Sequence, residues 1–123
     1  MSGAPAPLRG QIFHLDEEGV GPHYWLVVSN NRRNAHLRDV LTVMLTTTPP
    51  RSPRASYVPL DKTQDTFEGW VNCDDIGPHY RDQLGPVQGA LSPATMRRVG
   101  AGLAAALGLP APAVPGSPGQ SGR

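Results

Sequence analysis

The chain has 123 residues, of which 38% are hydrophobic, enough for one domain with one core and too few for two. Its formal net charge of +1 gives no overall attraction to nucleic acid, so any basic surface must be local. A single cysteine, Cys73, excludes an internal disulfide and fits a reducing compartment. No apolar stretch approaches the ~18 residues of a membrane span, and residues 1–7 do not resemble a signal peptide. We therefore expect a cytoplasmic protein.

The two ends of the chain differ in composition from its body. Residues 1–7 are small and rich in proline, and residues 110–123 consist mainly of Pro, Gly, Ser and Ala. Neither segment carries enough apolar side chains to offset the entropy that ordering costs. The composition predicts one folded domain over residues 8–109, with disordered segments at 1–7 and 110–123.

Short β-type runs separated by turn residues fill most of the body. The predicted strands cover residues 11–15, 24–29, 39–47, 57–60, 69–73 and 85–89. In residues 39–47 apolar side chains alternate along the chain, which is the period of a strand with one buried face and directs Thr46 away from the core. Pro59 and Pro86 each remove a donor from the ladder, so their strands are expected at a sheet edge or at a bend.

A helix is predicted at the C-terminal end of the domain. Leu91-Ser92-Pro93 supplies an apolar staple, a hydroxyl cap and a proline at the first helical position. Apolar residues then recur at helical spacing until Gly108 ends the element. A shorter helical turn is predicted over residues 32–37. Many short strands followed by one terminal helix predict a mainly β fold, a small closed or half-closed β-barrel.

The four histidines do not form a metal-binding pattern. They are His14, His23, His36 and His79, without the one-turn pairing of a helical metal site and without a nearby cysteine pair. The chain also lacks a glycine-rich phosphate loop between a strand and a helix, and it has no nucleophile elbow. We therefore expect no metal and no cofactor. RNA cleavage stays chemically possible, because the substrate's own 2′-hydroxyl can attack phosphorus once side chains move the protons and stabilise the phosphoryl charge.

A series of motifs lies in a fixed order along the body. They are Arg9-Gly10-Gln11-Ile12-Phe13, Leu-Val-Val-Ser-Asn at 26–30 followed by Asn34, the run that ends in Thr46, Asp-Asp-Ile-Gly at 74–77, Arg-Asp-Gln-Leu at 81–84, and the helix start at 91–96. Together they resemble the MazF/PemK family of toxin endoribonucleases over residues 8–109. The resemblance implies a mainly β, small SH3-like barrel of the PemK/CcdB-like toxin type with a C-terminal helix. It also implies a homodimer, a cognate antitoxin as partner, and metal-independent, sequence-specific cleavage of single-stranded RNA.

Two departures from the family pattern affect the expected mechanism. The family's catalytic Arg aligns with His23 and its companion Pro with Tyr24, while the Arg of its Gln-Ile-Arg motif is Gly77 here. The family's catalytic Thr aligns with Thr46. An imidazole can accept or give a proton near neutral pH, whereas a guanidinium stays charged, so His23 and Thr46 are the predicted catalytic residues. The alternative is a non-catalytic member of the same fold that acts by protein binding or retains only antitoxin binding, with His23 as a surface imidazole.

RNA contacts are predicted from arginine, whose planar fork suits phosphates, and from aromatic rings that stack on unpaired bases. The predicted RNA-binding residues are Tyr24, Arg32, Asn34, Arg51, Arg54, His79 and Tyr80. His79 is expected in a loop after Gly77-Pro78, where it is also a candidate for a second proton-transfer group. The competing interpretation is a solvated basic face with an exposed loop histidine. Trp25 and Trp70 lie in strand runs and are expected in the core or in a dimer contact.

Overall fold

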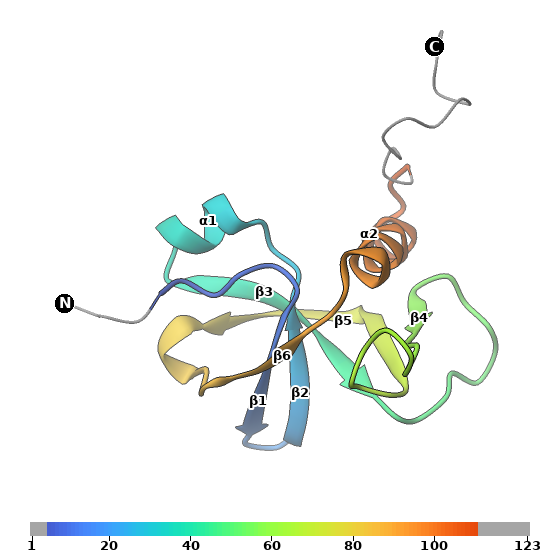
Figure 1. Cartoon of the computed structure of the whole chain (residues 1–123), viewed down its shortest axis with the longest axis horizontal. Coiled ribbons are helices and arrows are strands. Elements are labelled where there is room, and N and C mark those ends of the chain that lie inside the picture. Colours follow the sequence, from blue (N-terminus) through green and yellow to red (C-terminus); the bar gives the residue numbers. More distant parts are fainter. Residues whose placement is uncertain (1–4, 111–123) are drawn as a thin grey trace, which may run out of the picture.

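The computed structural model describes residues 5–110 of the chain. A six-stranded antiparallel sheet curls into a half-barrel, and a C-terminal helix packs against it (Figure 1). The strands are β1 (Gln11–Glu17), β2 (Gly21–Val27), β3 (Asp39–Thr46), β4 (Tyr57–Pro59), β5 (Trp70–Tyr80) and β6 (Val87–Ala90), in the order β4-β5-β3-β2-β1-β6. The helices are α1 (Asn31–His36), the 3-10 helix η1 (Arg81–Gln83) and α2 (Pro93–Leu107). The predicted mainly β fold with a C-terminal helix is confirmed.

The main departure from the predicted elements concerns β5. The sequence predicted a strand that ends at Cys73 and a loop that carries His79, whereas the strand continues to Tyr80. Pairing with β3 holds this second half extended, although Gly77 and Pro78 favour a turn. Because β4 pairs only with residues 70–72, the second half of β5 is a sheet edge on that side, where a proline costs no ladder bond. His79 therefore lies in a strand, and the predicted loop is wrong.

The N-terminal limit of the folded part also differs from the prediction. Pro7 is buried, so the ordered part of the chain begins before Leu8. A proline-rich segment forms neither helix nor strand here, but a proline ring can still bury apolar surface against a neighbour. The disorder predicted for residues 1–4 and 111–123 lies outside the described residues.

Alternation along the strands sends side chains to two faces of the sheet. The larger core lies on the face covered by α2 and contains Ile12, Leu26, Val43, Leu45, Val58, Val71, Cys73, Leu91, Met96 and Val99. Burial raises the pKa of the Cys73 thiol to about 11, so this thiol stays protonated at neutral pH. The second face carries a smaller cluster of Phe13, Val27 and Val40. The candidate catalytic residues belong to this second face.

Helix α2 is tied to the sheet at its first turn. The Ser92 side chain accepts a hydrogen bond from the Thr95 backbone N–H and caps the helix, and Gly108 ends it in the left-handed conformation at φ 71°. Asp65, which is only 4% exposed, accepts from the Ser92 backbone N–H at 2.8 Å and from the Thr95 hydroxyl at 2.6 Å. One carboxylate thus joins the β4–β5 connection to the start of α2.

Asp65→Ala is expected to lower the free energy of unfolding by about 2–3 kcal/mol, because one buried and one part-buried donor lose their acceptor. Asp65→Asn keeps one acceptor oxygen and should cost less. Urea unfolding followed by tryptophan fluorescence measures both variants. Asp61→Ala is the control, because this partly exposed carboxylate accepts only within its own turn, from Thr63, and should change stability much less. Equal stability of the Asp65→Ala and Asp61→Ala proteins would show that Asp65 does not anchor α2.

Candidate active site

His23 and Thr46 lie on neighbouring strands, at the same end of the sheet. The β2–β3 ladder pairs Val27 with Thr42 and Trp25 with Met44. Extending this antiparallel register by two residues places His23 opposite Thr46, and directly opposite residues direct their side chains to the same face. Both side chains are partly buried. The two predicted catalytic residues therefore lie on the same face of the sheet, beyond the last paired residues of β2 and β3.

The aromatic ring of Trp25 connects His23 to a buried histidine. The ring centroids of His23 and Trp25 are 6.4 Å apart, and those of Trp25 and His79 are 4.6 Å apart. His79 is only 6% exposed, with Nδ1 2.8 Å from Oγ1 of Thr42 and Nε2 3.6 Å from Oε2 of Glu17. Direct contact of His79 with RNA, which the sequence predicted, does not fit this burial. His79 instead supports the ring on which His23 packs.

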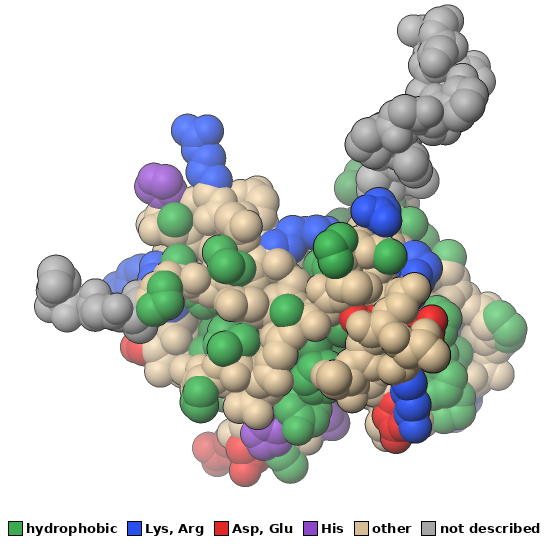
Figure 2. Space-filling model, viewed as in Figure 1, with side chains coloured by type: hydrophobic (Ala, Val, Ile, Leu, Met, Phe, Trp, Pro, Cys, Tyr) green, Lys and Arg blue, Asp and Glu red, His purple; other side chains and the backbone are tan. Residues whose placement is uncertain are grey.

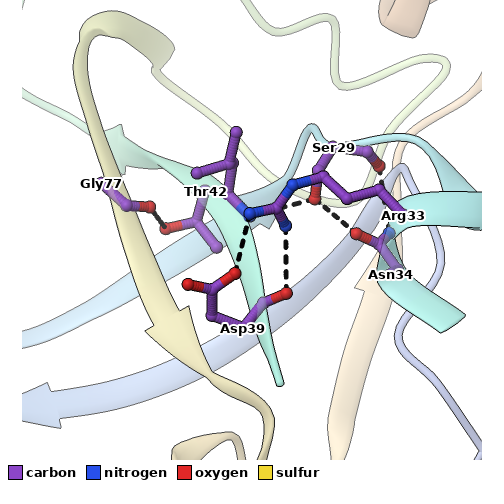
Figure 3. Close-up of polar contacts among 7 residues, drawn as sticks. Ser29, Arg33, Asn34, Asp39, Thr42 and Gly77 are labelled. Atoms are coloured by element: carbon purple, nitrogen blue, oxygen red, sulfur yellow. Dashed lines mark hydrogen bonds and ion pairs between the residues drawn. The ribbon is translucent and has the colours of Figure 1, made fainter. Parts of the chain in front are cut away.

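Trp25 is itself buried, at 4% exposure, as the sequence predicted for a core residue. Its indole N–H finds no hydrogen-bond partner among the described residues. The Thr42 hydroxyl on β3 donates to the carbonyl oxygen of Gly77 on β5 at 3.2 Å (Figure 3). Polar contacts therefore join β3 to β5, and the packing of the Trp25 and His79 rings joins β2 to β5.

Asn34 holds the connection between β2 and β3 in place (Figure 3). The Ser29 hydroxyl donates to Oδ1 of Asn34 at 2.5 Å, and Nδ2 of Asn34 donates to the Ser29 carbonyl at 3.0 Å. Nearby, Arg33 pairs with Asp39 at 2.8 Å, which fixes α1 to the start of β3. Asn34 is 0% exposed. The predicted contact of Asn34 with RNA therefore does not fit the structure, in which this side chain orders the β2–β3 connection.

Two predicted RNA-binding arginines lie close in the chain to Thr46. Arg51 and Arg54 belong to the connection that follows β3, and both are exposed. Arg54 pairs with Asp74 at 3.0 Å, and its guanidinium lies 5.7 Å from the centre of the Tyr57 ring. These contacts hold one guanidinium in place while leaving it accessible to a phosphate.

The other two exposed residues of the predicted RNA surface lie at the opposite end of β3. Arg32 is on α1, which precedes β3, and Tyr80 pairs with Asp39, the first residue of that strand. Tyr80 is 59% exposed. Thr46 is the last residue of β3, so about 23 Å of extended strand separate these residues from the candidate catalytic pair.

Tyr24 follows His23 in β2 but points to the other face of the sheet. Its ring centroid is 5.2 Å from that of His14 and 5.2 Å from that of Phe67. The side chain remains 41% exposed. The sheet thus separates Tyr24 from the candidate catalytic pair.

The part of the chain that the structure describes has no group of three His, Cys, Asp or Glu side chains placed to hold a metal ion. No helix within residues 5–110 is long and apolar enough to cross a membrane. A hollow of about 910 Å³ lies between the N-terminal segment and η1, beside Phe13, Arg38 and Tyr80. It is distinct from the end of the sheet that carries the candidate catalytic pair.

Comparison with known proteins agrees with the resemblance of the motifs. A family model described as the PemK-like, MazF-like toxin of type II toxin–antitoxin systems matches residues 8–107. Endoribonuclease MazF4 from Mycobacterium tuberculosis is 46% identical over 107 residues, which cover 87% of this chain and 98% of that protein.

Solved structures give the same result. An endoribonuclease from a mycobacterial species, in complex with its cognate antitoxin, is 45% identical at a TM-score of 0.78, covering 87% of this chain and 100% of the other. A MazE–MazF structure from Deinococcus radiodurans shares the fold at a TM-score of 0.71 and 19% identity, over 87% of this chain and 100% of the other. The chain therefore belongs to the PemK-like, MazF-like toxin family of type II toxin–antitoxin systems.

Proposed function

We propose that this protein is the toxin of a type II toxin–antitoxin pair and cleaves single-stranded RNA at specific sequences without a metal ion. The register that places His23 opposite Thr46 on one face of the sheet carries the proposal. Both residues occupy positions that correspond to catalytic residues in the family pattern. Membership of the family, and 46% identity to a protein named as an endoribonuclease, support the same activity.

The two side chains supply different parts of the reaction. The His23 imidazole takes the proton of the 2′-hydroxyl, whose oxygen then bonds to phosphorus as the bond from phosphorus to the 5′-oxygen breaks. The departing 5′-oxygen takes a proton from a water molecule, and the resulting hydroxide takes the proton held by His23. The products are a 2′,3′-cyclic phosphate and a 5′-hydroxyl, and His23 is neutral again. Oγ1 of Thr46 accepts a hydrogen bond from the Thr48 backbone N–H at 3.1 Å, which leaves its own proton to donate to a phosphoryl oxygen.

The exposed arginines extend the proposed RNA path from this pair. Arg51 and Arg54, in the segment after Thr46, bind phosphates next to the cleaved bond. Arg32 and Tyr80 contact more distant nucleotides, because the RNA must run the about 23 Å length of β3 to reach them. Basic contacts near the cleaved bond therefore matter more for cleavage than those beside α1.

A cognate antitoxin is the proposed protein partner, and the active form is a homodimer. Exposed apolar residues support the dimer: Leu8 and Val87 are 48% and 50% exposed and line the hollow of about 910 Å³. Figure 2 shows hydrophobic side chains on the surface over β1 and β6. β6 is also a sheet edge, with backbone groups available to a second chain. The proposed dimer contact is therefore this strand edge, with Leu8 and Val87 beside it.

Light scattering at micromolar concentration is expected to give twice the mass of one chain, which is 13.1 kDa. Val87→Glu should shift the protein toward the monomer, because it places a charge in the proposed contact. The control is Val20→Glu, which alters a residue of equal exposure, 50%, in the β1–β2 turn. A mass of one chain throughout the micromolar range would overturn the dimer.

The proposed activity is tested by incubating the purified protein with a mixed RNA pool in excess EDTA and sequencing the 5′-hydroxyl ends. Recurrent ends at one motif, undiminished by EDTA, are expected. A double variant with His23→Ala and Thr46→Ala, purified in the same way, controls for contaminating ribonuclease. If the parent produces no such ends but binds an antitoxin, the non-catalytic alternative replaces the proposed activity.

A further inference from the structure

The row of residues that contains the catalytic pair continues across two more strands. β3 pairs Thr46 with Trp70 of β5, and β5 pairs Trp70 with Pro59 of β4. Directly opposite residues share a face, and neighbouring strands are about 4.8 Å apart. The partly buried Trp70 side chain therefore stands next to Thr46, on the side away from His23.

A hollow of about 370 Å³ opens beside this row. Trp70, Pro59 and Leu60 form its apolar wall. Lys62 and Glu68, which are both exposed and form an ion pair with each other, line the same hollow. The hollow thus combines an aromatic surface with one strong hydrogen-bond donor and one strong acceptor.

The backbone at Gly69 holds the residues of the hollow close to the candidate active site. Gly69 has a φ of +101°, and a side chain there would overlap the carbonyl oxygen of Thr46. Only glycine combines this conformation with such a close approach. The start of β5 therefore packs closely against the end of β3, and this close packing fixes Thr46 and Trp70 relative to each other.

We propose that this hollow, the Trp70 subsite, holds an unpaired nucleobase of the RNA adjacent to the cleaved phosphodiester. The inference rests on the proposed ribonuclease function. The base stacks on the Trp70 ring, which accepts any base because every base has a π-face. Base identity is then selected by the Lys62 ammonium and the Glu68 carboxylate, which donate to and accept from the base edge. Part of the sequence specificity thus comes from a site next to the catalytic pair.

The stacking role is tested with Trp70→Leu and Trp70→Phe on an oligoribonucleotide that contains the cleaved sequence. Trp70→Leu should raise KM by about tenfold or more, with kcat changed by less than about threefold, because it removes base stacking and leaves the catalytic pair intact. Trp70→Phe retains an aromatic face and should stay within about threefold of the parent. Parent-like KM in a folded Trp70→Leu protein would overturn the stacking role.

The selection role is tested on the RNA pool with Lys62→Gln and Glu68→Gln, two surface changes that should not affect folding. Each is expected to alter base preference at one position of the recovered motif, next to the cleaved bond. Leu37→Ala changes an exposed apolar residue at the end of α1 and should leave the motif unchanged. An unaltered motif in both charge variants contradicts the selection role. Loss of antitoxin affinity without any change in cleavage would assign the hollow to a protein side chain.

A separate measurement distinguishes failure of the subsite from failure of the proposed activity. If the parent cleaves no RNA, the proposed activity fails, and the subsite is still tested by binding. The probe is a pool of single-stranded oligonucleotides with deoxyribose at every position, which lack the attacking hydroxyl. Binding should weaken about tenfold or more in Trp70→Leu and much less in Trp70→Phe. Equal binding by the parent and both variants would overturn the subsite.

Discussion

His23→Ala is expected to lower the rate of RNA cleavage by about 100-fold or more, with a much smaller change in RNA affinity. The His23 imidazole lies on the strand next to that of Thr46 and on the same face of the sheet, and the Trp25 ring packs against it. Removing it takes away the proton acceptor while leaving the arginines that bind phosphate. Single-turnover rates give the loss in chemistry, and binding of a deoxyribose analogue gives the affinity.

Three further variants show whether the lower cleavage rate of His23→Ala is due to the loss of proton transfer. His23→Arg restores the family residue and should flatten the pH dependence near neutrality, because a guanidinium does not titrate there. Thr46→Ala should also be impaired, since a donor to the phosphoryl oxygen is lost. His14→Ala removes an exposed imidazole from the opposite face of the sheet and should cleave like the parent. If His23→Ala and Thr46→Ala both cleave at the parent rate, the mechanism is wrong.

Local signals were sufficient for the helix boundaries and for the face of the sheet on which Thr46, the proposed catalytic threonine, lies. The cap at Ser92 and the stop at Gly108 depend on residue types within one turn of the helix, so the sequence predicted both ends of α2. The alternation along β3 gave the face of Thr46 in the same way, because strand period depends only on neighbouring residues. Its pairing with His23 required the additional knowledge that the two strands are antiparallel neighbours.

Long-range contacts decided what the sequence could not show. His79 follows a Gly-Pro pair that favours a turn, and its burial depends on Trp25 and Glu17, more than fifty residues away in the chain. The Trp70 subsite depends on β5 lying beside β3, an order that no local pattern specifies. These positions were assigned to the surface or to packing because their partners are distant in sequence.

Gly69→Ala is expected to lower the free energy of unfolding by about 3 kcal/mol or more, and to reduce cleavage strongly in the protein that still folds. The added Cβ would require a positive φ and would overlap the Thr46 carbonyl oxygen. The strain in φ alone costs about 1–2 kcal/mol, and the overlap must in addition move β5 away from β3. That movement would separate Thr46 from Trp70. Urea unfolding and single-turnover cleavage measure the two effects.

Substitutions at two other glycines separate the two causes of the lower stability of Gly69→Ala, which are strain in φ and steric overlap. Gly19, in the β1–β2 turn, has a φ of +84° and free space around an added Cβ, so Gly19→Ala should show the strain alone, about 1–2 kcal/mol. Gly77 has free space and an unstrained φ, so Gly77→Ala should be neutral or stabilise by up to about 1 kcal/mol. The difference between Gly69→Ala and Gly19→Ala then measures the contact that holds β5 against Thr46. If the two variants are equally stable, β5 can move away from β3 at little cost, and Gly69 does not fix the geometry of the site.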